Sequence, residues 1–225
     1  MTFVEECVRD SLPMWRACLD TPFLRGLADG TLDENCFLGY IVEDSLYLRE
    51  YAKVFAWGIL HAKSMSEVRT YYSLLSYVSE SEDAARLQYL EKYGMTDDEV
   101  QALPLRPENQ AYVDTMLRAA QQGEGAAECL MACLPCMLSY IWIFKKLLED
   151  HPEVADTVFG PLVREYVSKE YDDECRRWTA FADEVCKELD EIREARCRKI
   201  FRACSQHEYS FWRMCERPRD DIRRL

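Results

Sequence analysis

Apolar residues recur every three or four positions along most of this chain, and few residues interrupt that pattern. The 225 residues include only eight glycines and eight prolines, and these fall between the long segments of helical period. No segment shows a convincing alternation of apolar and polar residues, which is the pattern of a half-buried strand. The sequence therefore predicts an all-α fold, with a short helix near residue 22 and longer helices over about 33–63, 66–93, 107–121, 125–149, 160–189 (with an interruption possible) and 190–216.

Capping signals mark where several of these helices begin and end. The opening "TFVE" has the spacing of a capping box, and Thr96 and Glu99 repeat that spacing. Pro22 stands near the first position of the short helix and Gly30 lies just past its end, as is typical of helix termini. Gly94 marks the end of the helix expected over 66–93.

Two acidic residues interrupt apolar helix faces. Residues 3, 4, 7, 11 and 14 positions apart share a face, because each residue turns a helix by about 100°. Asp44 interrupts a face formed by Phe37, Tyr40, Tyr47 or Leu48, Tyr51 and Phe55. Glu208 interrupts a face formed by Cys197, Phe201, Cys204, Phe211 and Cys215. Because an ionised carboxylate is costly to bury alone, each acid either caps a backbone group, pairs with an inward Arg or Lys, or belongs to a functional site.

A third face carries thiols. Cys129, Cys133 and Cys136 share one side of the helix over 125–149 with Tyr140, Ile143 and Leu147. Their C-x3-C-x2-C spacing matches the iron–sulfur motif of radical S-adenosylmethionine enzymes, but such a cluster needs its thiolates in a wrapping loop, and this spacing lies on helical sequence. No Glu-x-x-His pair and no second C-x2-C or His motif is present. We therefore expect no metal ligands and no cofactor.

Cys136 stands apart from its neighbours because it follows a proline. Pro135 lacks a backbone N–H and clashes with the preceding turn, so the helix should bend or fray at Cys136. A thiol also needs a base, a cation or hydrogen-bond donors to react as a thiolate. His207 points about 100° away from its neighbour Glu208 on the helix, which leaves Tyr140 and the two carboxylates as the expected partners.

A basic heterocycle would suit this set of groups as a substrate. If its apolar surroundings keep Glu208 neutral, this side chain can protonate a ring nitrogen. An ionised Asp44 can accept hydrogen bonds from an exocyclic amine. Protonation then makes a ring carbon electrophilic toward Cys136.

Size, charge and cysteine content limit the classes of protein that remain. The length suits one domain, which we expect over 1–217, followed by a charged tail over 218–225 that frays. A formal net charge of -13 repels nucleic acid and anionic membrane surfaces, so neither is an expected partner. No run reaches the roughly 18 uncharged apolar residues of a membrane span, and 130–144 comes closest. The start "MTFVEECVRD" lacks a secretion signal, so eleven cysteines indicate reduced thiols in the cytoplasm.

Three segments, "FLRGLADGTLDENCFLGYIVEDSLYLREYAKVFA", "LPCMLSY" and "HEYSFW", resemble the TenA family, also called thiaminase II. The resemblance spans nearly the whole chain. The family's catalytic cysteine corresponds to Cys136, and its two carboxylates correspond to Asp44 and Glu208, which interrupt the apolar faces. Its pocket tyrosines correspond to Tyr47, Tyr112, Tyr140 and Tyr166, the last on a looser match.

The resemblance implies a single-domain bundle of the haem oxygenase-like fold, commonly a homotetramer, that works without a cofactor. It implies hydrolysis of thiamin, or of the aminopyrimidine left when thiamin decays, to hydroxymethylpyrimidine in thiamin salvage. In the implied mechanism Cys136 adds to the pyrimidine ring, Glu208 supplies and recovers the proton, and the amine or thiazolium departs. Water then attacks the methylene and the cysteine is expelled. The presence of Cys136 indicates the cysteine-bearing branch of the family.

Other interpretations stay open at this stage. A non-catalytic bundle that binds a pyrimidine or thiamin would be stabilised by its ligand without forming product. A redox or metal protein would use the cluster of Cys129, Cys133 and Cys136. The sequence does not decide between thiamin and the aminopyrimidine, nor does it fix the oligomer or the protonation state of Glu208. The extra cysteines are expected to pack in the core as small hydrophobic residues: Cys129, Cys133, Cys197 and Cys204.

Overall fold

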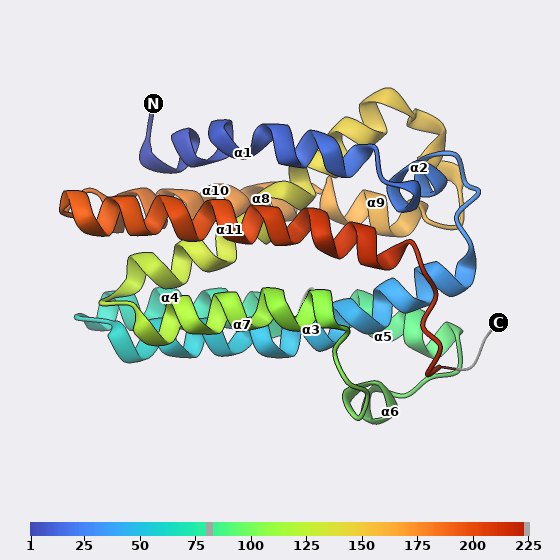
Figure 1. The fold of residues 1–225 in the computed structure, drawn as a ribbon, viewed down its shortest axis with the longest axis horizontal. Coiled ribbons are helices and arrows are strands. Elements are labelled where there is room, and N and C mark those ends of the chain that lie inside the picture. The colour runs from blue at the N-terminus through green and yellow to red at the C-terminus, as the bar shows by residue number, and fades with distance from the viewer. Residues whose placement is uncertain (80–82, 223–225) are drawn as a thin grey trace.

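The computed structural model describes residues 1–79 and 83–222, which form helices joined by turns, with no strand among them (Figure 1). The long helices are α1 (Phe3–Leu19), α3 (Glu34–His61), α7 (Pro107–Gln122), α8 (Ala126–Asp150), α10 (Lys169–Cys186) and α11 (Glu191–Cys215). The shorter elements are α2 (Pro22–Ala28), α4 (Met65–Tyr77), α5 (Asp83–Lys92), α6 (Asp97–Gln101), the 3-10 helix η2 (Pro152–Asp156) and α9 (Gly160–Tyr166). The prediction of an all-α fold is confirmed.

Most helix ends lie close to the residues that the sequence predicts. Thr2 and Thr96 each form a capping box with the glutamate three residues later, an arrangement that stabilises a helix by about 1 kcal/mol. Pro22 opens α2, and Gly30 follows its end with a φ of 68°, which favours glycine. The interruption expected within 160–189 lies between α9 and α10, where Ser168 caps the second helix.

The helix expected over 66–93 is described in two parts. The structure has two helices here, α4 and α5, and residues 80–82 between them lie outside the described residues. The sequence from 79 to 86, "SESEDAAR", contains no large apolar side chain.

Of the bend or fraying expected at Cys136, fraying is not found. Helix α8 runs without a break through Pro135. A proline inside a helix removes one backbone hydrogen bond, but Leu134 and Pro135 are buried, and α8 is packed on several sides. Tertiary packing therefore outweighs the local cost of the proline.

Helix α8 lies at the centre of the bundle and packs against α1, α3, α7, α10 and α11 (Figure 1). By length and composition alone α8 could cross a membrane, but 83% of its most apolar window is buried inside the fold, as in a core helix. Helices α3 and α4 approach closely at Gly58, where a Cβ atom would come within 2.2 Å of the Tyr71 ring. Figure 1 shows α11 crossing the middle of the molecule between α1 and the pair α3 and α7.

The chain after α11 turns back onto the bundle. The Arg219 side chain is only 2% exposed, forms an ion pair with Glu43 of α3, and donates a hydrogen bond to the Pro104 carbonyl at 2.8 Å. The Cys36 thiol donates to the carbonyl of Glu216 at 3.3 Å. The expectation that the segment after Pro218 frays is therefore wrong at Arg219.

Candidate active site

Four helices each place one candidate side chain in the interior. Asp44 lies on α3, Tyr112 on α7, Cys136 on α8 and Glu208 on α11. Asp44, Tyr112 and Glu208 are 5%, 1% and 1% exposed, whereas Cys136 is partly exposed. The Asp44 and Cys136 side chains are both close enough to affect the ionisation of Glu208. The residues selected from three separate helix faces therefore converge on one place.

Glu208 has a neutral partner. The Tyr112 hydroxyl donates a hydrogen bond to Glu208 Oε1 at 2.5 Å, and no Arg or Lys of the described residues forms an ion pair with this carboxyl. Burial raises the pKa of Glu208 to about 8, helped by the charge of Asp44 and opposed by Tyr112, Ser139 and Cys136. A carboxyl with this pKa keeps its proton over most of the neutral range and can act as an acid.

Two other buried acids have cationic partners instead. Glu128, which is fully buried, accepts hydrogen bonds from Arg193 at 2.8 and 3.1 Å. Glu43, also fully buried, pairs with Arg219. These pairs are the arrangement expected of structural acids, since an opposite charge repays part of the cost of burial. Glu208 differs from both because its partner is a neutral hydroxyl, and this difference keeps it a candidate for the functional acid.

Asp44 faces a cation that sequence reasoning missed. Arg86 Nη1 lies 3.2 Å from Asp44 Oδ2, and the two side chains are 4% and 7% exposed. Glu165 is close to both: burial raises its pKa to about 7, while Arg86 lowers it and Asp44 raises it. A buried Arg86 has no signature in the sequence, because α5 is short and mostly polar. The structure therefore adds Arg86 and Glu165 to the candidate residues around Asp44.

The thiol of Cys136 is distinguished by its exposure. All eleven cysteines fall within the described residues, and the other ten are buried. Burial raises the pKa of Cys129 to about 12, and it raises the pKa of Cys133 as well. Those two neighbours on α8 are therefore held as thiols, in keeping with core packing. Cys136 is the member of the three that a reagent or substrate can reach.

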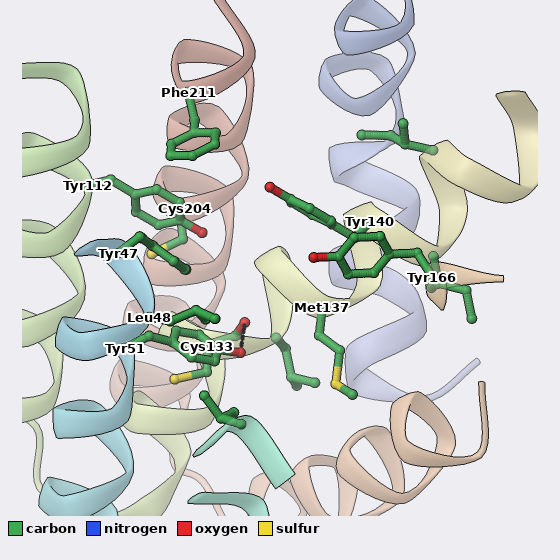
Figure 2. Packing of buried hydrophobic residues seen from close by; sticks show 14 of the residues in the cluster. Tyr47, Leu48, Tyr51, Tyr112, Cys133, Met137, Tyr140, Tyr166, Cys204 and Phe211 are labelled. Atoms are coloured by element: carbon green, nitrogen blue, oxygen red, sulfur yellow. Dashed lines mark hydrogen bonds between the residues drawn. The ribbon is translucent and has the colours of Figure 1, made fainter. Parts of the chain in front are cut away.

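The candidate tyrosines surround these groups from two sides. Tyr47 packs against Tyr112 with ring centroids 5.0 Å apart, and burial together with the nearby Cys136 raises the pKa of Tyr47. Tyr140 and Tyr166 meet edge to face at 4.8 Å. Figure 2 shows the Tyr112 hydroxyl on one side, and the Tyr140 and Tyr166 hydroxyls on the other, pointing toward one another. Tyr166, whose match to the family is looser, thus lies beside Tyr140, whose match is more secure.

Tyr40 places a further hydroxyl beside the candidates. Its side chain is fully buried. Burial and the charge of Asp44 raise the pKa of Tyr40, whereas hydrogen bonding with Tyr140 and Tyr166 lowers it. Three tyrosine hydroxyls therefore gather near Asp44.

Three other kinds of site are relevant among the described residues: a metal site, a histidine partner for Glu208 and a surface cavity. No group of three or more His, Cys, Asp and Glu side chains there is arranged to hold a metal ion. His207 turns away from Glu208, as helical spacing predicts: it stacks on the Tyr112 ring at 5.2 Å and contacts Thr115 Oγ1 at 3.0 Å. A surface cavity of about 480 Å³ is lined by His61, Glu67, Arg193 and other residues, and by none of the candidates.

The fold and the buried groups together define a class: an all-α bundle that encloses a thiol, two carboxyls and several tyrosines. The fold is haem oxygenase-like. A solved domain of unknown function with that fold, from Shewanella denitrificans, matches with a TM-score of 0.66 at 12% identity, over 94% of this chain and 91% of that chain. The chain belongs to the TENA/THI-4/PQQC family, whose model matches residues 9–217. The family expected from the sequence is thereby confirmed.

Individual relatives agree with this assignment. An aminopyrimidine aminohydrolase from Halalkalibacterium halodurans is 30% identical over 219 residues, covering 95% of both chains. A protein of the same name from Bacillus subtilis is 29% identical over 219 residues, covering 96% of this chain and 91% of its own. The structure of a TenA family transcription regulator from Silicibacter sp. TM1040 matches with a TM-score of 0.87 at 23% identity, over 96% of this chain and 97% of that one.

Proposed function

We propose that this protein is a hydrolase of thiamin salvage that releases 4-amino-5-hydroxymethyl-2-methylpyrimidine from the corresponding 5-aminomethylpyrimidine, from thiamin, or from both. Relatives named aminopyrimidine aminohydrolase, about 30% identical over most of the chain, support the reaction class. The observation that carries the proposal is Glu208, a buried acid whose partner is Tyr112 rather than a cation. Such a group can deliver a proton to a bound heterocycle at neutral pH.

Cys136 is the proposed nucleophile. Its sulfur adds to a carbon of the pyrimidine ring while Glu208 protonates a ring nitrogen, which makes that carbon electrophilic. The ring electrons then expel the protonated amine as ammonia, or the thiazolium of thiamin as the neutral thiazole, from the methylene. Water adds to the methylene and releases a proton, the cysteine leaves the ring as a thiolate, and Glu208 recovers its proton from the ring nitrogen. The net reaction consumes one water and replaces the amine, or the thiazolium of thiamin, with a hydroxyl.

Asp44 is the proposed anchor of the substrate. Its carboxylate can accept hydrogen bonds from the exocyclic amine of the pyrimidine. Arg86, 3.2 Å from Asp44 in this structure, would have to share or yield that carboxylate when the substrate binds. The tyrosines proposed to contact the flat ring are Tyr47, Tyr112, Tyr140 and Tyr166.

The direct test supplies the pure protein with each substrate in turn. We expect hydroxymethylpyrimidine to accumulate from the aminomethylpyrimidine or from thiamin, as measured by liquid chromatography and mass spectrometry, and the ratio of kcat/KM values gives the preferred substrate. Thermal stabilisation by either compound without any product would instead identify a non-catalytic pyrimidine-binding bundle. Neither binding nor product, with the protein folded and reduced, would reject the proposal.

Tyr112→Phe tests the partner of the acid. The Tyr112 hydrogen bond lowers the pKa of Glu208, so its loss should raise that pKa and move the basic limb of kcat/KM to higher pH. Loss of the bond itself should reduce kcat/KM by roughly fivefold to tenfold. Tyr71→Phe is the matched control, because Tyr71 is another buried tyrosine, whose hydroxyl donates to the Ala126 carbonyl at 2.7 Å. A Tyr112→Phe profile that superimposes on the control would contradict this assignment.

Three further statements remain predictions from the sequence and accompany this proposal. They are a homotetrameric assembly, a cytoplasmic location, and a domain that spans 1–217 with a tail over 218–225. The reaction itself needs a small-molecule substrate and no cofactor in the proposed mechanism.

A further inference from the structure

The proposed chemistry makes no use of the buried charge cluster around Glu43. This carboxylate is fully buried, one residue before Asp44. Asn109 Nδ2 donates to Glu43 Oε2 and to the Glu43 carbonyl, each at 2.9 Å. Arg106 Nε lies 3.4 Å from Glu43 Oε1, and the Arg219 guanidinium forms the closest ion pair. The cluster therefore surrounds one carboxylate with hydrogen bonds and ion pairs from α7, from the loop before it, and from the C-terminal segment.

The same cluster joins the helices that carry the candidate site. Arg106 Nη1 donates to the carbonyls of Met214 and Arg217 at 2.9 and 3.0 Å, which ties Glu43 to the end of α11, the helix of Glu208. Asn109 lies one helical turn before Tyr112 on α7. The cluster thus joins the turn of α3 that carries the substrate anchor to α7, one turn before Tyr112, and to the end of α11, more than one turn beyond Glu208.

Adjacent residues on a helix point about 100° apart, so Glu43 and Asp44 face different surroundings from the same turn of α3. A fixed direction for Glu43 therefore fixes the rotation of that turn, and with it the direction of Asp44. Arg219 is itself held in place, because it also donates to the Pro104 carbonyl at 2.8 Å and to Asp221 at 2.6 and 2.8 Å. The backbone of Arg219 lies against Gly39, where an added Cβ would come within 3.4 Å of its nitrogen.

We propose that Arg219, in the segment after the last helix, is a positioning residue for the reaction: it holds Glu43 and thereby directs Asp44 toward the bound pyrimidine. The inference rests on the proposed function. It assigns the end of the chain a part in substrate recognition, although Arg219 is not proposed to touch the substrate. Arg219 contacts neither Tyr112 nor Glu208. The proton-transfer step should therefore be preserved when Arg219 is changed.

The test compares Arg219→Met with wild type, with Arg219→Lys, and with Arg217→Met. Arg217 is the matched control, because its guanidinium is 68% exposed and pairs with Glu108 at the surface. We expect Arg219→Met to raise KM for the aminomethylpyrimidine about tenfold, to change kcat less than threefold, and to leave the pH profile of kcat in place. Arg219→Lys should fall between it and wild type, since lysine keeps the charge but not the forked set of donors. Arg217→Met should match wild type.

A merely structural role would lower the fraction of folded enzyme, and hence the apparent kcat, without changing KM. If the Arg219→Met variant folds and its KM equals that of wild type, the inference is overturned. The proposed function still stands in that case, provided that wild type turns over the substrate. Wild type that neither binds nor converts the substrate would instead reject the proposed function. If Arg219→Met does not fold, the charge-balanced pair Glu43→Gln with Arg219→Met decides: a raised KM supports the inference and a wild-type KM refutes it.

Discussion

Cys136→Ser is expected to abolish product formation from both substrates, lowering kcat/KM by about 10³-fold or more. The thiolate is the proposed nucleophile, and a serine hydroxyl in the same place is far less acidic and has no strong base beside it among the proposed groups. Substrate binding should persist, because Asp44 and the tyrosines are unchanged. The measurement is kcat and KM by product chromatography, together with calorimetric binding of the substrate to the variant.

Cys129→Ser is the matched control for that variant, since it makes the same change two turns earlier on α8 at a buried thiol. It should retain turnover per folded molecule near that of wild type, with folding checked by circular dichroism. Comparable turnover in Cys136→Ser would remove this cysteine from the mechanism while leaving the hydrolase intact. Equal loss in both variants would point to packing of α8 rather than to nucleophilic attack.

Glu208→Gln should lower kcat by about 10²-fold to 10⁴-fold and remove the basic limb of the pH profile. In wild type the acid must be protonated in the free enzyme, so kcat/KM should stay level below pH 7 and fall as pH rises through about 8. Glutamine keeps the shape and still accepts from Tyr112, but it carries no proton to give. Measured kcat/KM across pH 6 to 10 checks the expectation, and a limb that persists in the variant would assign it to another group.

The same substitution should have the opposite effect on stability. The folded pKa of Glu208, about 8, lies above the ordinary value of 4.5, so its contribution to the free energy of unfolding is complete below the lower value and is lost as pH rises to the higher one. The loss is on the order of 5 kcal/mol at most, since each pKa unit corresponds to about 1.4 kcal/mol. Thermal melts should therefore show Glu208→Gln gaining stability relative to wild type between pH 5 and pH 9.

The parts of the site that lie on long apolar helices could be predicted from the sequence. Asp44 and Glu208 each break a regular face, and a break of that kind is visible without a structure because the helix period fixes which residues lie inward. The period cannot say what an inward acid meets. It is the spatial partner, Arg86 for Asp44 and Tyr112 for Glu208, that separates an ion-paired carboxylate from one kept neutral.

Residues whose burial depends on distant segments could not be predicted. Arg219 follows a proline in a short basic stretch, which by composition is typical of a loose terminus, yet its guanidinium is buried against Glu43. Glu128 lies in the first turn of α8, and its charge is balanced there by Arg193, which is far along the chain.

The ten buried cysteines affect how the protein is inactivated rather than how it works. Folding keeps these sulfurs buried, so oxidants in solution have little access to them in the native molecule. Unfolding exposes all eleven thiols at once, and an odd number of thiols cannot pair completely within one chain. Oxidative scrambling and cross-linking should then outrun refolding, so heat inactivation without a reductant is irreversible, and the lifetime of the enzyme in air is governed by the rate at which it opens.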